Sequence, residues 1–253
     1  TLAGDRLSVP QAIELSNYDR LPDLIPVRHG RMTKSPFTFY RATASLMAAD
    51  LAVTPSTGIT VQACGDCHLM NFGGFATPER NLVLDINDFD ETIHGPWEWD
   101  LKRLATSFVL AAREKGFSPE TAEEICIELI DSYRDKLIEF SQMKLMDFWH
   151  FRFDIERIRQ DTKDEQVSAR LTAAINKANK QTHDRVFYKI TSNTLGTFSI
   201  ADQPPLVMHP IDVKESMAMI KAFIDHYRTT LQPDRRWLLD QYHVVDIALN
   251  VVG

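Results

Sequence analysis

Apolar residues recur at helical spacing along most of this chain, and this periodicity limits it to a largely helical fold. Apolar side chains step by three and four residues over 37–51, 97–111, 122–140 and 213–231. Each set lies on one face of a helix, so each predicted helix has a face to bury. We therefore expect a fold built mainly from packed helices.

One junction between predicted helices carries clear end signals. Gly116 is the residue type that ends a helix, whereas Ser118 and Pro119 are the N-cap and first-turn types that begin one. We therefore expect a long helix to begin at Ser118. Further on, the aromatic residues of 148–153 predict either core residues or a contact between helices, and the charged stretch 156–182 predicts an exposed helix.

Strand signals are few and short. The runs 59–64 and 81–86 are partly β-branched, and Gly73 and Gly74 stand between them, which predicts a small hairpin joining the two runs. A second hairpin is predicted over 192–198. The fold class that these elements indicate is α+β and predominantly helical.

Charge and composition exclude two classes of protein. The formal net charge of −7 and the isoelectric point near 5.6 lack the basic footprint of a nucleic-acid-binding protein. The sequence also has no run of about 18 apolar residues, the length that a membrane-spanning helix needs. We therefore expect neither nucleic acid nor a membrane as a partner. Three cysteines fit a reducing compartment, and we expect the cytoplasm. Because the Cys64-x-x-Cys67 pair lacks further zinc ligands, two buried structural residues are favoured over a metal or redox site.

Acidic and amide side chains gather between residues 64 and 103, close to the ends of the predicted strands. Like charges this close raise one another's pKa unless a cation neutralises them. Carboxylate and amide oxygens suit Mg²⁺, which takes one or two carboxylates and keeps water or phosphate at its other positions. The same residue types also form turns and helix caps, so composition alone leaves both interpretations open. The residues concerned are Asp66, Asn71, Asp85, Asp88, Asp90 and Asp100.

The order of these residues resembles the aminoglycoside phosphotransferase and choline kinase branch of the protein-kinase-like superfamily. The resemblance rests on Gly-Asp-x-His-x-x-Asn at 65–71, an Asp-Phe pair at 88–89 and Gly-Pro-x-x-x-Asp-Leu at 95–101. It implies a protein-kinase-like C-lobe in which the small β-hairpin carries the acidic site.

The resemblance also implies individual roles. Asp66 would be the catalytic residue that orients or deprotonates the acceptor hydroxyl, and Asn71 and Asp88 would hold the metal. The implied cofactors are Mg²⁺ and ATP. Phosphoryl transfer depends on such positioning and on charge neutralisation around the moving group.

Four neighbouring residues have supporting roles by the same resemblance or remain further candidates. His68 and Asp100 match positions that brace the catalytic loop, and Asp85 and Asp90 are additional candidates for the metal or its surroundings. Cys64 departs from the family pattern, because small-molecule kinases usually carry His at that position. That change falls at a scaffold position.

The front of the chain departs more strongly from that family. A kinase N-lobe with a glycine-rich loop and a strand lysine should precede the catalytic loop, yet only 65 residues precede Asp66 and their pattern is helical. The sequence therefore shows neither the glycine-rich loop nor the strand lysine that would hold ATP.

A closer resemblance, to the bacterial domain-of-unknown-function 2252 family, covers more of the chain. It is densest over 26–115 and includes Arg-His-Gly-Arg-Met at 28–32, Asn-Asp-Phe-Asp-Glu-Thr at 87–92 and Glu-Trp-Asp at 98–100. It implies a kinase-like fold with permuted order, in which the nucleotide lobe follows the catalytic loop. We therefore expect one kinase-like domain over 1–253, truncated before that lobe. Its parts are N-terminal helices at 1–58, a catalytic-loop hairpin at 59–103, a helical substrate part at 104–240 and, at 241–253, the start of a strand that leads into the missing lobe.

One basic cluster lies near the front of the chain. Arg28, Arg31 and Arg41, with Lys34, could grip an anion or pair with the acidic hairpin, because arginine matches phosphate and carboxylate equally well. We favour a structural pairing. The isolated histidines are expected to be ordinary loop or surface residues rather than ligands; these are His29, His94 and His209.

The leading functional hypothesis is a Mg²⁺- and ATP-dependent phosphotransferase acting on a small molecule. Nucleotidyl transfer would use the same residues. A metal-dependent phosphohydrolase, in which Asp85 or Asp88 holds metal or attacks phosphate, is a second hypothesis. A catalytically inactive kinase-like binding module is the third.

Overall fold

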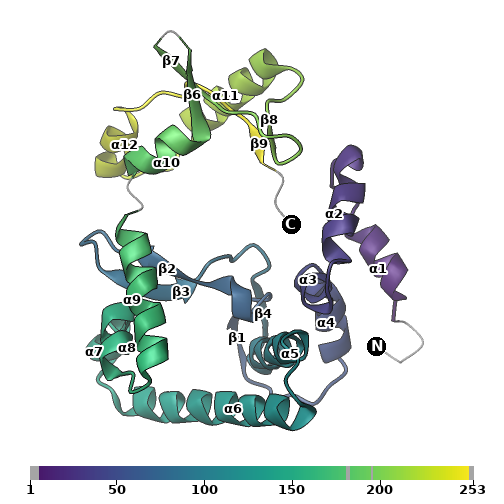
Figure 1. Cartoon of the computed structure of the whole chain (residues 1–253). Helices are drawn as coiled ribbons and strands as arrows, with labels where there is room; N and C mark the ends of the chain where they lie inside the picture. Colours follow the sequence, from purple (N-terminus) through teal and green to yellow (C-terminus); the bar gives the residue numbers. More distant parts are fainter. Residues whose placement is uncertain (1–5, 181–182, 195, 251–253) are drawn as a thin grey trace. The chain divides into compact units, whose positions relative to one another are not determined.

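The computed structural model describes residues 6–180, 183–194 and 196–250 (Figure 1). The chain divides into two compact units, Thr1–Asn176 and Lys177–Gly253. The fold is α+β and mostly helical, with small antiparallel sheets, as the periodicity predicts. Each unit is described by itself below.

The first unit begins with short helices instead of one long helix over 37–51. That prediction is wrong, because a break at Ala42 and Thr43 separates two helices. At this break the guanidinium groups of Arg28 and Arg103 donate to the Ala42 and Tyr40 carbonyls, and the Thr43 hydroxyl donates to the Phe39 carbonyl. These bonds satisfy carbonyl groups that the helix end leaves free. The elements are α1 (Val9–Leu15), the 3₁₀ turn η1 (Pro22–Leu24), α2 (Ile25–Met32), α3 (Pro36–Arg41) and α4 (Ala44–Leu51).

Five short strands and a 3₁₀ turn follow in the first unit. They are β1 (Thr60–Ala63), η2 (Leu69–Asn71), β2 (Phe72–Ala76), β3 (Leu82–Ile86), β4 (Ile93–Pro96) and β5 (Phe153–Asp154). Strand β1 pairs with β4, and β3 pairs with β2 and β5, all antiparallel.

The predicted hairpin between 59–64 and 81–86 is therefore wrong in its pairing, although both runs are strands. Gly73 and Gly74 do not form a turn but lie within β2, opposite Asp85 and Leu84. The turn before β3 is made instead by 77–81, where Arg80 has a φ of 68°.

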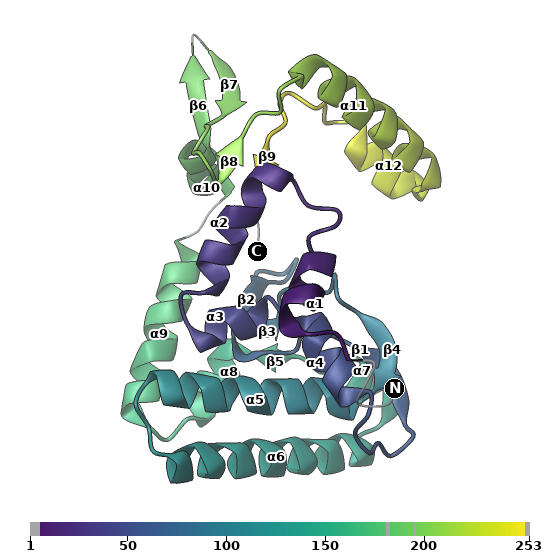
Figure 2. The same cartoon turned by 90° about the vertical axis from the view of Figure 1, so that its right-hand side faces the viewer.

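The long helices α5 (Glu98–Glu114) and α6 (Pro119–Gln142) lie side by side (Figure 2). The predicted junction is confirmed: Gly116 has a φ of 77°, and the Ser118 side chain accepts a hydrogen bond from the Thr121 backbone N–H. The unit continues with α7 (Leu145–Trp149), α8 (Ile155–Asp161) and α9 (Glu165–Asn179). Among the helices that the structure describes, none combines the length and apolar character needed to span a bilayer.

The predicted aromatic contact is also confirmed. Phe140 near the end of α6 packs edge-on against Phe148 and Phe151, and Phe151 packs against Phe153 of β5. These edge-to-face contacts fix the turn of the chain after α6.

The core of the first unit lies where α2 to α5 meet the loop after β1. Its most buried side chain, Ser107 of α5, is fully enclosed. The Ser107 hydroxyl accepts a hydrogen bond from the Leu69 backbone N–H and donates to the Leu104 carbonyl. A buried hydroxyl with both roles satisfied connects the core helix to the loop.

The second unit has α10 (His183–Ile190), β6 (Thr191–Thr194), β7 (Thr197–Ile200), β8 (Val207–Met208), α11 (Val213–Thr230), α12 (Pro233–Leu239) and β9 (Leu249–Asn250). The predicted hairpin over 192–198 and the helix over 213–231 are confirmed. Within the strand expected over 241–253, the described residues form only the two-residue β9, and 251–253 lie outside the described part. None of the side chains described in this unit is fully buried.

The Ser118 cap offers a direct test of the helix junction. We expect Ser118→Ala to lower the free energy of unfolding by about 1 kcal/mol, because the Thr121 N–H loses its acceptor. Ser132→Ala, at an exposed position in the same helix, is the matched control and should change stability by less than about 0.5 kcal/mol. Chemical denaturation measures both, and equal effects would show that the cap contributes nothing.

Candidate functional site

The loop between β1 and η2 is unusually buried for a polar segment. Cys64, Cys67, His68 and Asn71 are all buried. Because buried backbone and polar groups need hydrogen-bond partners, the surrounding helices must supply them.

Helix α5 supplies several of these partners from one face. Near its start, Asp100 accepts hydrogen bonds from the backbone N–H groups of Cys64 (2.7 Å) and Gly65 (3.0 Å). One turn on, Arg103 binds Asp66, and Ser107 receives the Leu69 N–H. Asp100 is thereby committed to the loop backbone.

Gly65 is required by both backbone conformation and space. Its φ is +79°, and a Cβ atom there would lie 1.9 Å from the carbonyl oxygen of Glu91. The loop therefore packs directly against the segment that carries Asp88 and Asp90. No residue other than glycine fits this contact.

The carboxylate of Asp66 is held by two buried side chains. The Arg103 Nε–H donates to Asp66 Oδ1 at 2.7 Å, and His68 Nε2 lies 3.4 Å from Oδ2. Burial alone raises the pKa of Asp66, but the hydrogen bond with His68 and the charge and hydrogen bond of Arg103 outweigh it and lower the pKa. Asp66 is therefore an oriented anion at neutral pH.

His68 has a defined hydrogen-bonding role. Its Nδ1 accepts a hydrogen bond from the Met70 backbone N–H at 3.1 Å, so the ring carries its hydrogen on Nε2 and points it at Asp66. The ring also packs edge-on against Phe37 of α3, with centroids 6.3 Å apart.

Arg103 is the site residue to which the sequence interpretation gave no role. Its side chain is 3% exposed, donates to the carbonyl of Tyr40 and lies over the Tyr40 ring at 4.4 Å. The available signal was the spacing of Asp100, Arg103 and Ser107, which places three polar side chains on one face of α5.

Asn71 connects two of the other predicted site residues. Its Nδ2 group donates to the backbone carbonyls of Asp66 (3.1 Å) and Asp88 (3.2 Å). Both amide hydrogens are thus used, and Oδ1 has no hydrogen-bond partner among the residues that the structure describes. The structure therefore brings the Asn71 side chain together with the backbones of Asp66 and Asp88.

The remaining acidic candidates are exposed. The side chains of Asp85, Asp88 and Asp90 all face solvent. Asp85 accepts a hydrogen bond from the neighbouring Ile86 N–H, as a strand-end residue commonly does. Within the described ranges, no three His, Cys, Asp or Glu side chains form a metal-binding group.

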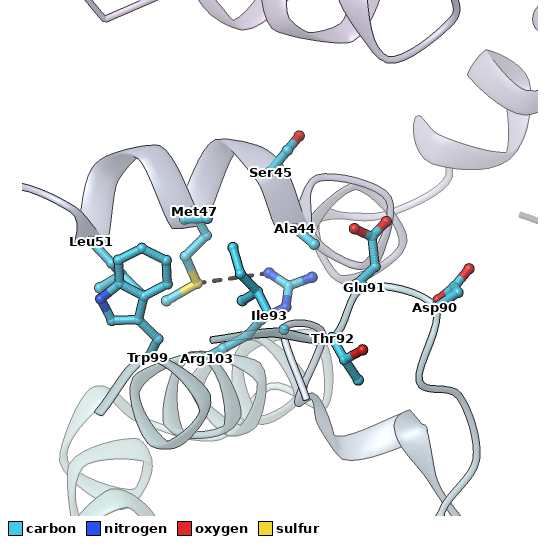
Figure 3. Close-up of a pocket in the computed structure, with 12 residues that line it drawn as sticks. Ala44, Ser45, Met47, Leu51, Asp90, Glu91, Thr92, Ile93, Trp99 and Arg103 are labelled. Atoms are coloured by element: carbon cyan, nitrogen blue, oxygen red, sulfur yellow. Dashed lines mark hydrogen bonds between the residues drawn. The ribbon is translucent and has the colours of Figure 1, made fainter. Parts of the chain in front are cut away.

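A cavity of about 320 Å³ lies beside the loop, between α4, the start of α5 and residues 90–93 (Figure 3). The Arg103 guanidinium points into it, close to Met47, while Asp90 and Glu91 stand at another side. Trp99 and Leu51 contribute apolar surface. Acidic and basic groups face the same space, so its charge does not select one class of ligand.

The side chains of the basic cluster do not contact the acidic loop among the described residues. Arg28 is buried and donates to Asn17 Oδ1 (3.0 Å) and to the Ala42 carbonyl (3.3 Å), and burial followed by the charge of Arg20 lowers its pKa. Its partners are neutral groups rather than acids.

The other two predicted members of the cluster stand apart from Arg28. Arg31 is half-buried and Arg41 is exposed, and neither side chain forms an ion pair in the described part of the chain. The backbone carbonyl of Arg41 nevertheless accepts a hydrogen bond from Arg103 at 3.5 Å.

The cysteine pair has the environment of buried structural residues. Cys64, Cys67 and Cys126 are free, and the first two are buried. Burial, with help from the nearby Asp100 charge, raises the pKa of Cys67 to about 12. A thiol that resists ionisation in this way is a poor metal ligand or nucleophile.

The family model described as "Uncharacterized protein conserved in bacteria (DUF2252)" matches residues 20–253. Searches of curated proteins and of solved structures gave no match.

The contact between Gly65 and Glu91 leads to one prediction. We expect Gly65→Ala to cost more than about 3 kcal/mol of stability, because both the positive φ and the Glu91 carbonyl oppose a side chain. Gly58 has nearly the same φ, +80°, with open space around it, so Gly58→Ala should cost only about 1 kcal/mol. Denaturation curves of both variants separate steric conflict from backbone strain.

The hydrogen bonds of Asp100 lead to another. Asp100→Asn is expected to destabilise the protein by about 1–3 kcal/mol, because its amide group opposes one of the two loop N–H groups. Asp19→Asn, at an exposed position without a hydrogen bond in the described structure, should be close to neutral. If urea midpoints moved equally for both, the bracing role of Asp100 would be wrong.

Proposed function

The chain belongs to the DUF2252 family of bacterial proteins, and we propose that its site is that of a magnesium-dependent phosphotransferase. In this proposal ATP is the phosphoryl donor and a hydroxyl group of a small molecule is the acceptor. The loop and α5 would be parts of a kinase-like catalytic lobe.

The observation that carries this proposal is the position of the Asn71 amide. Its Nδ2 group is fixed by the carbonyls of Asp66 and Asp88, which turns Oδ1 away from those two bonds. Asn71 thus offers an oriented amide oxygen, and Asp88, whose backbone it binds, carries an exposed carboxylate. These two oxygen donors are the ligand types that a hard cation prefers. The bracing of the loop backbone by Asp100 further supports the kinase-like interpretation.

The donor set fits Mg²⁺. This ion takes one or two carboxylates and fills its other positions with water and substrate phosphates, so Asp88 and Asn71 suffice without a third acidic ligand. When bound, Mg²⁺ would neutralise charge on the phosphate oxygens.

Asp66 would act mainly by orientation. Its carboxylate is held by Arg103 and by His68, and its lowered pKa makes it a weak base. We therefore propose that Asp66 accepts the hydrogen bond of the acceptor hydroxyl and aims that oxygen, rather than removing its proton early. Such positioning suits phosphoryl transfer, because its transition state needs little general-base catalysis.

The proposed compartment is the cytoplasm. Three free cysteines, Cys64, Cys67 and Cys126, suit a reducing environment.

Calorimetric titration of Mg²⁺ and ATP into the full-length protein, separately and together, tests the proposal. We expect nucleotide binding that depends on Mg²⁺ and is weakened at least about tenfold in Asp88→Asn, because one charged ligand is removed. Asp147→Asn, an exposed position on α7, is the control and should bind as the unaltered protein does. A folded protein that binds neither ligand would overturn the enzyme proposal and favour an inactive binding module.

A further inference from the structure

His209, in the second unit, is not an isolated histidine. Its Nδ1 atom lies 2.8 Å from Asp202 Oδ1, and its Nε2 atom lies 3.1 Å from Asp246 Oδ2. The ring thus stands between two carboxylates, one at each nitrogen. In the described part of the chain, these are the charged groups that face it.

The protonation of the ring follows from this geometry. A carboxylate only accepts hydrogen bonds, so both ring nitrogens must carry hydrogen for both contacts to be hydrogen bonds. The hydrogen bond with Asp246 and then that with Asp202 raise the pKa of His209 above its ordinary value. The doubly protonated, positively charged ring is therefore the form that the structure stabilises.

The same two carboxylates also bind backbone groups. Asp246 accepts hydrogen bonds from the N–H of Ile200 (2.7 Å) and of Ile247 (2.9 Å), and Asp202 accepts from the N–H of His209 itself (2.9 Å). The cluster therefore joins the end of β7, the residue after β8 and the segment before β9.

Besides this cluster, backbone hydrogen bonds between Gln203 and Val207 join the residues after β7 to β8. Strands β8 and β9 pair over two residues each. Because no described side chain of this unit is fully buried, apolar packing adds little to the connection.

We propose that Asp202, His209 and Asp246 form a proton-operated clasp that holds β8 against β9 and opens when the ring loses one proton to solvent. On that loss one nitrogen presents a lone pair to a carboxylate oxygen. One hydrogen bond is then replaced by repulsion, while the other stays.

The direction of the pH effect follows from the raised pKa. The clasp contributes fully below the pKa of a histidine in the unfolded chain, about 6.5, and its contribution is lost as pH rises through the higher folded value. The segment around β8 and β9 is therefore closed below the ordinary histidine pKa of about 6.5 and opens as pH rises through the higher folded value.

A titration of the 253-residue chain followed by NMR tests the clasp. The His209 ring signal, assigned by its disappearance in His209→Gln, should titrate with a midpoint above about 6.5. Exchange protection of the Ile200 and His209 amides, corrected for intrinsic rates, should fall as pH rises from about 6.5 through that midpoint. The fall should be about tenfold for each unit by which the midpoint exceeds the ordinary value.

Two variants separate the clasp from general effects of pH. In His209→Gln the protection of the Ile200 amide should no longer change with pH, whereas His226→Gln, at an exposed position on α11, should behave as the unaltered chain does. A ring midpoint at or below about 6.5 would overturn the proposal even if the Gln variant did not fold. Persistence of the full pH response in a folded His209→Gln would overturn it as well.

Discussion

The first unit depends on the polar face of α5. A loop that buries Cys64, Cys67, His68 and Asn71 also buries backbone groups, and these would be unsatisfied without partners. Asp100, Arg103 and Ser107 supply those partners at the spacing of one helix face, and each binds a different part of the loop. The position of Asp66 is therefore fixed by a helix that begins more than thirty residues later in the sequence.

The same helix also shapes the front of the unit. Arg103 extends from the loop to the Tyr40 carbonyl, and Arg28 reaches the Ala42 carbonyl two residues further on. Two buried cations thus lie at the C-terminal end of α3, where a helix presents its negative end. The Ala42 carbonyl gives Arg28 a hydrogen-bond acceptor in place of an acidic partner, although burial and the charge of Arg20 still lower its pKa.

Short-range sequence patterns predicted the elements whose formation depends on neighbouring residues. The ends at Gly116 and Ser118 and the helix over 213–231 follow from caps and periodicity, and both are confirmed. At the break at Ala42 and Thr43, arginines from elsewhere in the chain bind the Tyr40 and Ala42 carbonyls, and these distant contacts could not be predicted from the local pattern. Strand pairing is also non-local, because β1 pairs with β4, so that Thr60 lies opposite Pro96 and Ala63 opposite Ile93.

The candidate site was accessible from the sequence in part. The order of Asp66, Asn71 and Asp88 was visible, and so was their resemblance to a phosphotransferase motif. Their connection was not, because Asn71 reaches the other two residues through backbone carbonyls that every residue possesses. Arg103 could be found only by asking which polar side chains share a face of α5 with Asp100.

The shallow burial of the second unit has a thermodynamic consequence. The heat-capacity change of unfolding scales with the apolar surface that becomes exposed, and the described side chains of this unit conceal little of it. Opening of this unit therefore has a small heat-capacity change and a shallow dependence on denaturant. The free energy of this opening is therefore only weakly curved with temperature.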